Sequence, residues 1–291
     1  MYNSKIEPGS LFPTINSLSQ SFTKSEKKVL DAFLKNPEDL LYSSIIDYAE
    51  KAGVGDTTVI RFCRKLGFKG YHSFKMAVAQ ELSRSSEEIL TNFNEEIGPH
   101  EDIETIMQKL IKINISALQE TAALIKEEQV NMAVKFIESS QRVIFFGSGS
   151  SGITALDAKN KFMRVGLYVD AFADGHMQAM AASLLNKEDT AVAISHSGSS
   201  KDTVEALKIA KQCNAKTICI THHAASPITK YADVMLLSGY REGPLQGGAM
   251  ATKIAQLYVI DILYTEFFRK NLKASSANKA KTTEAITEKL Y

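Results

Sequence analysis

The chain has 291 residues, of which 44% are hydrophobic and 23% are charged, and its formal net charge is +1. This length exceeds the usual domain size of about 100 to 200 residues, so we expect two domains with separate cores. The near-neutral balance excludes nucleic-acid binding through overall positive charge. The three cysteines have no disulfide or metal-site spacing, and neither an apolar leader nor a run of about 18 apolar residues occurs. We therefore expect a soluble cytoplasmic protein without metal, cofactor or membrane contact.

Residues 1–82 predict an all-α domain that contains a helix-turn-helix motif. Within residues 43–68, one helix with an apolar face is followed by a Gly-Val-Gly turn at 53–55. A second helix follows, with apolar residues at Val59, Phe62 and Leu66. A short glycine turn between two such helices is typical of helix-turn-helix units.

The second helix of this motif carries a basic face. Between Asp56 and Met76 there are five Lys or Arg residues, the last of them Lys75, and one acidic residue. Positive charge is therefore concentrated where a recognition helix would meet DNA. The alternative is an ordinary packing motif whose basic face is only solvated. The predicted DNA-binding residues are Asp56, Thr57, Thr58, Arg61, Arg64, Lys65 and Lys69.

The pattern changes twice after the helix-turn-helix. Residues 83–104 are rich in Ser, Asn and acidic residues and predict a linker, and helices are expected at about 103–126 and 129–139. From residue 142 onward, short apolar runs alternate with segments compatible with helices, and two final helices are expected at 249–269 and about 279–290. This alternation predicts a parallel sheet flanked by helices, an α/β/α sandwich, over residues 105–291.

The segment AISHSGSSKDTVEALKIA, residues 193–210, joins an apolar strand to an amphipathic helix through a loop rich in hydroxyls. Its hydroxyl residues are Ser195, Ser197, Ser199, Ser200 and Thr203. Ligands of open parallel sheets bind at the carboxyl ends of the strands, where helix N-termini favour anions. Hydroxyls at such a position suit a phosphate monoester, whereas helix capping alone needs a single serine.

A second hydroxyl loop occupies residues 148–151, after another apolar strand, and contains Ser148, Ser150 and Ser151. Two such loops at one sheet edge could hold the two ends of a small polar ligand. The same loop also contains the spacing GxGxxG, and Asp170 is expected to end the next strand. That combination is the outline of a dinucleotide fingerprint, so an NAD(H)-sensing domain is the alternative.

Two stretches resemble known families. The run TVIRFCRKLGFKG, residues 58–70, is similar to the hallmark of RpiR-type transcriptional regulators, although Gly55 stands where members of that family usually carry Ser. SHSGSS resembles the SxSGxT loop of sugar isomerase (SIS) domains, and the first loop resembles their GxGxS element. The resemblance covers about residues 10–290. It implies a regulator of carbohydrate metabolism that binds operator DNA as a homodimer or homotetramer and senses a sugar phosphate.

The resemblance also implies the ligand contacts. Ser151, Ser195, Ser197 and Ser200 match the phosphosugar-binding positions, and the predicted site is completed by their neighbours in the two loops and the following helix, Ser150, His196, Gly198 and Thr203.

Because the SIS fold also includes isomerases, an aldose-ketose isomerase is a further, less favoured alternative. Isomerisation needs a carboxylate base and often a histidine. His196 lies in the right loop, but Glu205 is expected to point away, and residues 247–260 offer no carboxylate before Asp261. We therefore predict no enzymatic turnover. A glycine-rich loop at 239–248 carries Arg241, and the sequence is equally compatible with a loop that closes over the ligand and with an ordinary surface loop.

Overall fold

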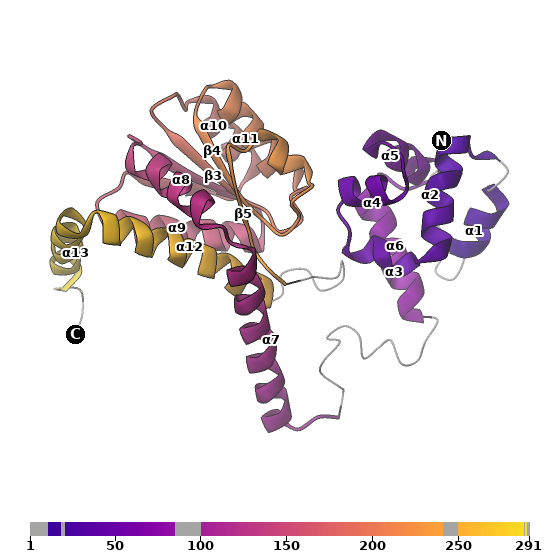
Figure 1. Ribbon diagram of the computed structural model, residues 1–291, viewed down its shortest axis with the longest axis horizontal. Helices are drawn as coiled ribbons and strands as arrows, with labels where there is room; N and C mark the ends of the chain where they lie inside the picture. The colour runs from indigo at the N-terminus through magenta and orange to yellow at the C-terminus, as the bar shows by residue number, and fades with distance from the viewer. Residues whose placement is uncertain (1–10, 19–20, 85–99, 241–249, 288, 290–291) are drawn as a thin grey trace. The chain divides into compact units, whose positions relative to one another are not determined.

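The computed structural model describes residues 11–18, 21–84, 100–240, 250–287 and 289. The described chain forms two compact units that divide between Lys112 and Ile113 (Figure 1). The first unit is helical, and the second is a parallel sheet with helices on both faces. The predicted fold class is therefore confirmed. None of the described helices is long and apolar enough to cross a bilayer.

Aromatic and aliphatic side chains form the core of the N-terminal unit. Phe33, Phe62 and Phe74 are buried, and the Phe74 ring contacts both of the others, with centroids 5.5 Å from Phe33 and 5.8 Å from Phe62. Its helices are α1 (Leu11–Leu18), α2 (Lys24–Lys35), α3 (Pro37–Tyr42), α4 (Ile45–Lys51), α5 (Asp56–Lys65) and α6 (Tyr71–Arg84).

The helix-turn-helix consists of α4 and α5, and local sequence sets its ends. Ser44 caps α4 in a capping box: its Oγ accepts from the Asp47 amide at 3.1 Å, and the Asp47 carboxylate accepts from the Ser44 amide at 3.2 Å. In the turn that follows, Gly53 has a φ of 63°, a left-handed conformation that favours glycine. The predicted motif is confirmed because α5 begins at Asp56 and buries Val59, Phe62 and Cys63.

The second unit is built on five parallel strands in the order β2-β1-β3-β4-β5. The strands are β1 (Val143–Gly147), β2 (Val169–Phe172), β3 (Thr190–Ile194), β4 (Lys216–Thr221) and β5 (Val234–Leu237). Its helices are the second half of α7 (Ile103–Leu124), within which the two units divide, α8 (Glu127–Glu138), α9 (Ser150–Met163), α10 (Gly175–Ser183), α11 (Lys201–Gln212), α12 (Met250–Lys270) and α13 (Leu272–Thr287), and η3 (Pro227–Tyr231) is a short 3-10 helix.

Both faces of the sheet are covered, which explains why its strands are continuous apolar runs. Helices α8, α9 and α12 cover one face, where Phe145 packs, and α10 and α11 cover the other, where Phe146 packs (Figure 1). The last helix differs from expectation, because α13 begins at Leu272 rather than near residue 279. Tertiary contacts support its earlier turns: Ser275 is buried, and the side-chain amide Nδ2 of Asn278 donates to the carbonyl of Val165 at 3.0 Å.

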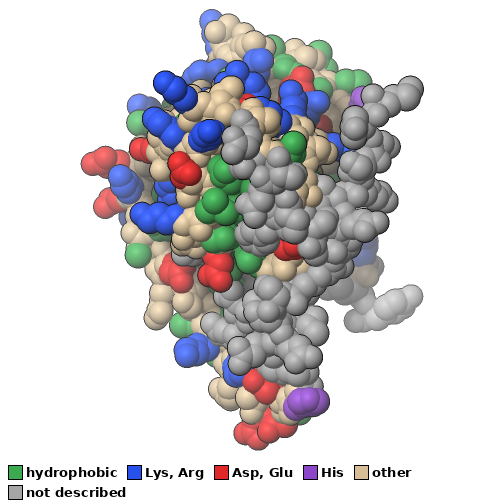
Figure 2. All heavy atoms as spheres, turned by 90° about the vertical axis from the view of Figure 1, so that its right-hand side faces the viewer, with side chains coloured by type: hydrophobic (Ala, Val, Ile, Leu, Met, Phe, Trp, Pro, Cys, Tyr) green, Lys and Arg blue, Asp and Glu red, His purple; other side chains and the backbone are tan. Residues whose placement is uncertain are grey.

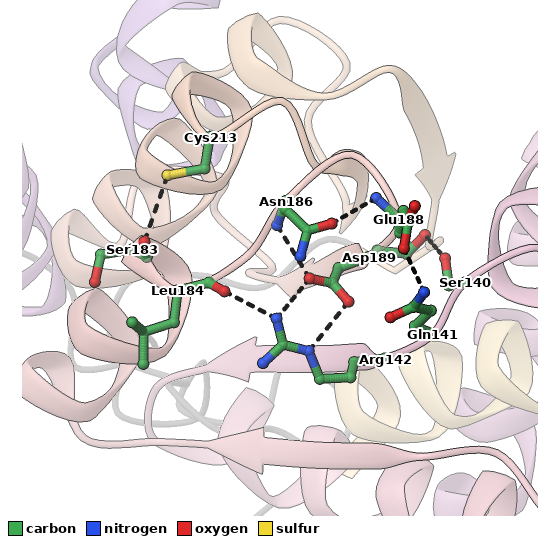
Figure 3. Close-up of polar contacts among 10 residues, drawn as sticks. Ser140, Gln141, Arg142, Ser183, Leu184, Asn186, Glu188, Asp189 and Cys213 are labelled. Atoms are coloured by element: carbon green, nitrogen blue, oxygen red, sulfur yellow. Dashed lines mark hydrogen bonds and ion pairs between the residues drawn. The ribbon is translucent and has the colours of Figure 1, made fainter.

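A buried ion pair joins the amino ends of β1 and β3 (Figure 3). The guanidinium of Arg142 donates to both carboxylate oxygens of Asp189, at 3.1 and 2.7 Å, and to the carbonyl of Leu184 at 2.8 Å. The Asp189 side chain is fully buried, and its Oδ2 also accepts from the Asn186 amide at 3.0 Å. These contacts fix the relative positions of the two strands whose opposite ends carry the hydroxyl loops.

Candidate functional site

The two hydroxyl loops lie side by side at the carboxyl edge of the sheet. The first follows β1 and the second follows β3, and these are neighbouring parallel strands. The chain continues from β1 to β2 on one side and reaches β3 on the other, so the strand order reverses between the two loops. Ligands of open α/β sheets bind at such a topological switch point.

Hydrogen bonds connect the two loops. Ser148 Oγ and Thr203 Oγ1 lie 3.2 Å apart, which links the first loop to the start of α11. Within the second loop, Ser195 Oγ donates to Ser200 Oγ at 3.1 Å. Ser195 and Thr203 are almost completely buried, whereas Ser197 is exposed in the same loop. The site therefore combines buried hydroxyls, those of Ser195 and Thr203, with the exposed hydroxyl of Ser197.

Ser200 of the second loop precedes α11 but does not cap it with its side chain. Ser200 occupies the N-cap position of α11, but its side chain makes no capping hydrogen bond to the described helix. The N-terminus of a 12-residue helix is thus left without a side-chain acceptor beside several hydroxyls. Such an N-terminus favours an anion through its amide groups and its dipole.

Gly198 sets the path of this loop. Its φ is 60°, and a Cβ at this position would lie 2.1 Å from Ser226 Oγ and 2.9 Å from Thr221 Oγ1. Any larger residue would therefore need both an unfavourable backbone conformation and a displaced neighbour.

The first loop is supported by glutamines from two helices, and the sequence did not indicate either glutamine as part of the site. Gln178 of α10 is fully buried, and its Nε2 donates to Gly147 O and Ser148 Oγ, both at 3.2 Å. Its Oε1 is buried and has no hydrogen-bond partner among the described residues. Gln256 of α12 donates to Ser151 Oγ at 3.1 Å. Ser151 is thus bonded within the protein, while Ser150 next to it is half-buried.

Three histidines gather beside the second loop. The ring of His196 stacks on that of His222, with centroids 5.1 Å apart, and the rings of His222 and His223 lie 4.8 Å apart. The His222 amide donates to His196 O at 3.0 Å, which ties the ends of β3 and β4 together. From the sequence, His222 and His223 follow a strand that ends at the same sheet edge, where they could approach the ligand or, as the favoured interpretation, fill the loop. Their proximity to His196 depends on strand pairing, which no local signal shows.

Asp170 does not lie where a dinucleotide-binding site would need its acidic residue. Asp170 does not end β2 but is the second of its four residues, opposite Ile144 in β1. Its carboxylate accepts from Lys159 of α9 at 2.7 Å. A ribose-binding carboxylate would lie at the carboxyl end of the strand, so the predicted position of Asp170 was wrong.

Within the described part of the chain, the two carboxylates weighed for isomerisation, Glu205 and Asp261, have other surroundings. Glu205 is exposed on α11. Asp261 of α12 forms an ion pair with Lys161. The glycine-rich loop with Arg241 lies outside the described residues.

The structure places most of the predicted DNA-binding residues on the outer face of α5. Thr57, Arg61, Arg64 and Lys69 are exposed, and Lys and Arg side chains gather over the upper part of the face seen in Figure 2. Gly55 is the N-cap of α5 and provides no side-chain acceptor, while Asp56 Oδ1 accepts from the Thr57 amide at 2.7 Å.

Two of the predicted polar residues have partners inside the N-terminal unit. Thr58 is buried rather than on the outer face, because it lies four residues before Phe62 and shares the inner face of α5. Its Oγ1 accepts from Arg61 at 3.3 Å. Lys65 forms an ion pair with Glu26 at 3.3 Å and lies over the Phe22 ring at 5.3 Å.

Lys75, which contributed to the basic count, is also directed inward. Its Nζ donates to the carbonyl of Ser43 at 3.1 Å, and burial lowers the pKa of its ammonium group to about 8. The exposed cationic face is therefore narrower than the sequence suggested and centres on Arg61, Arg64 and Lys69.

Comparisons with known proteins agree with the two-unit architecture. Residues 9–85 match the helix-turn-helix domain of the rpiR family, and residues 136–266 match the SIS domain. A helix-turn-helix domain followed by a SIS domain defines a class of transcriptional regulators. The chain belongs to the RpiR family of these regulators, as its relatives show.

Three similar proteins span almost the whole chain. An uncharacterized HTH-type transcriptional regulator of Haemophilus influenzae is 41% identical over 96% of this chain and 97% of its own. The HTH-type transcriptional regulator RpiR of Escherichia coli is 28% identical over 94% of this chain and 90% of its own. The solved structure of Vibrio vulnificus NanR, complexed with ManNAc-6P, has a TM-score of 0.85 at 27% identity and covers 96% of this chain and 99% of that one.

Proposed function

We propose that this chain regulates genes of carbohydrate metabolism and that a sugar phosphate, bound at the two hydroxyl loops, controls its affinity for operator DNA. The observation that carries the proposal is the juxtaposition of those loops at the switch point, joined by Ser148 and Thr203 next to the start of α11. Hydroxyls and helix amides there can surround the oxygens of a phosphate monoester.

The sugar itself would extend from the phosphate toward neighbouring polar groups. Gln178 Oε1 can accept from a ligand hydroxyl or amide, and His196 stands at the other loop. An amino-sugar phosphate is the favoured class, and the complex of the similar NanR protein with ManNAc-6P supports this choice.

DNA would be bound through α5 in a homodimer or a homotetramer. A single helix-turn-helix makes few contacts, so specific binding uses two recognition helices on a palindromic site. Control by the ligand requires that the sugar phosphate bind the two states of the protein with different affinities.

We further infer that the ligand is sensed and not converted. The position of Glu205 on the exposed side of α11 and the pairing of Asp261 with Lys161 leave neither as a base for proton transfer between sugar carbons. Incubation with each sugar phosphate, followed by NMR of the ligand, should show no isomerised product.

A thermal-shift titration against sugar phosphates, with NAD and NADH included, tests the ligand. A ligand at about 100 times its dissociation constant should add roughly 2.7 kcal/mol of stability. Ser197→Ala should abolish the shift, because Ser197 is the exposed hydroxyl of the second loop. Ser139→Ala is the control, since this exposed serine follows α8 away from the site. A shift produced by NADH alone, or one unaffected by Ser197→Ala, would contradict the proposal.

A further inference from the structure

Helix α7 carries a stripe of exposed apolar side chains along its first half. Ile103, Met107, Ile111 and Ile115 are 71%, 56%, 50% and 48% exposed, and Leu110 beside them is 39% exposed. The first four are spaced by four residues, so they form one continuous ridge on the helix. Contiguous apolar surface of this kind marks an interaction site, whereas single exposed apolar residues are ordinary.

The second half of α7 is anchored in its own unit. Ala117 is fully buried against Ala251 and Ala255 of α12, and Thr121 Oγ1 accepts from the Gly239 amide at 2.9 Å. Within α7, the buried residues are Ala117 and Thr121, both beyond the stripe. The helix is thus held at one end and presents its apolar ridge at the other.

Charges beside the ridge favour a second copy of the same helix in the antiparallel direction. Glu104 and Lys112 are exposed, and both lie on the same side of the ridge. Antiparallel pairing about a two-fold axis sets like flanks together and brings Glu104 of one copy to Lys112 of the other. Parallel pairing about a two-fold axis would set opposite flanks together, so Glu104 of one copy and Lys112 of the other would lie on different sides of the pair and would not meet.

We infer that the first half of α7 is a dimerisation surface, on which two copies of the chain pair antiparallel about an axis near residue 109. Ile103 then packs against Ile115 of the second copy, and Met107 packs against Ile111. The interface is isologous, which gives the closed two-fold symmetry that a palindromic operator requires. This inference rests on the homodimer of the proposed function but not on the identity of the ligand.

The first test uses the full chain and analytical ultracentrifugation. Met107→Glu with Ile111→Glu should raise the dimer dissociation constant at least 100-fold, because four carboxylates would meet at the axis. The comparison variant is Met180→Glu with Leu184→Glu, an apolar pair at the end of α10 that is at least as exposed on average, at 54% and 70%. That variant should leave dimerisation unchanged. Dissociation by the α10 pair and not by the α7 pair would overturn the inference.

Disulfide crosslinking tests the direction of pairing and needs no disruption of the fold. In a Cys213→Ser background, which removes the half-exposed thiol, a mixture of Ile103→Cys and Ile115→Cys chains should crosslink on mild oxidation. Ile103→Cys alone should not, because its two copies would be about 18 Å apart along the pair, at 1.5 Å per residue. Crosslinking of Ile103→Cys alone would show parallel pairing. A dimer without either crosslink would refute this interface and leave the proposed function intact, whereas a monomeric wild type would contradict both.

Discussion

The two units present groups that suit phosphate in opposite ways. The N-terminal unit carries Arg61, Arg64 and Lys69 on the exposed side of α5 and just beyond it. The C-terminal unit carries hydroxyls that are largely buried next to the start of α11, where Ser195 and Thr203 are at most 1% exposed. The difference indicates that one surface is built for an extended polyanion and the other for a single small anion.

Electrostatics explains why the two solutions differ. Exposed cations bind DNA by releasing the counterions condensed on its phosphates, so they work best in water and on long, flexible side chains. A buried cation would lose its hydration, and without the ligand no negative charge would offset that free-energy cost. Hydroxyls and helix amides lose much less, and they provide directional hydrogen bonds to a phosphate.

The largest expected effect is a different response to salt. If the dimer contacts 6 to 10 phosphates, raising salt from about 50 to about 200 mM should weaken operator binding by roughly 10³- to 10⁵-fold. The affinity for the sugar phosphate should change by less than about tenfold over the same range, because the ligand's expected contacts are mainly hydrogen bonds to largely buried groups. Fluorescence anisotropy and calorimetry at matched salt concentrations measure both. If the affinities for operator DNA and for the sugar phosphate depended equally on salt concentration, the proposed difference between the two surfaces would be contradicted.

A second prediction disturbs the C-terminal unit alone. Asp189→Ala removes the buried carboxylate that accepts from Arg142 and from the Asn186 amide. Because the Arg142 side chain is 35% exposed and can be solvated, the variant should destabilise this unit by only about 2 to 3 kcal/mol. Hydrogen exchange should accelerate in β1 and β3 but not in α5. The control is Glu188→Ala, an exposed neighbour that accepts from Gln141, with an expected change within about 0.5 kcal/mol. Equal effects of the two variants would show that the buried pair is not what holds the strands.

The smallest effect concerns recognition of the operator. Arg61→Ala should weaken operator binding by roughly 1 to 3 kcal/mol if Arg61 contacts a base, and sugar-phosphate binding should be unchanged. Lys208→Ala, an exposed lysine on α11, removes the same charge far along the chain and serves as the control. Ser197→Ala should show the reverse pattern. Equal losses of both activities in either variant would contradict two separate binding surfaces.

Features that depend on local pattern could be predicted from the sequence. The helix-turn-helix was predictable because α4 and α5 have one apolar face each and a glycine turn between them. The parallel sheet was predictable because its strands are apolar runs spaced by helical segments. The loops after β1 and β3 were assigned to one sheet edge for the same reason, since parallel strands end on the same side.

Errors arose where a neighbour distant in sequence determines the environment. Thr58 lies on the inner side of α5, where it faces other helices, and Lys75 donates to Ser43 across the same unit. Asp170 lies near the middle of β2, where it pairs with Lys159 instead of ending the strand. Residue type alone suggested an exposed or ligand-facing position for each.

The sequence by itself determined the order of elements, the chemistry of the hydroxyl loops and the basic character of α5, because these follow from periodicity and from residues adjacent in the chain. Tertiary structure decided which side chains meet. Strand order placed Ser148 next to Thr203 and His196 next to His222, and helix packing directed Gln178 into the first loop. Such contacts depend on how sheet and helices close on one another, and that closure is a property of the whole core.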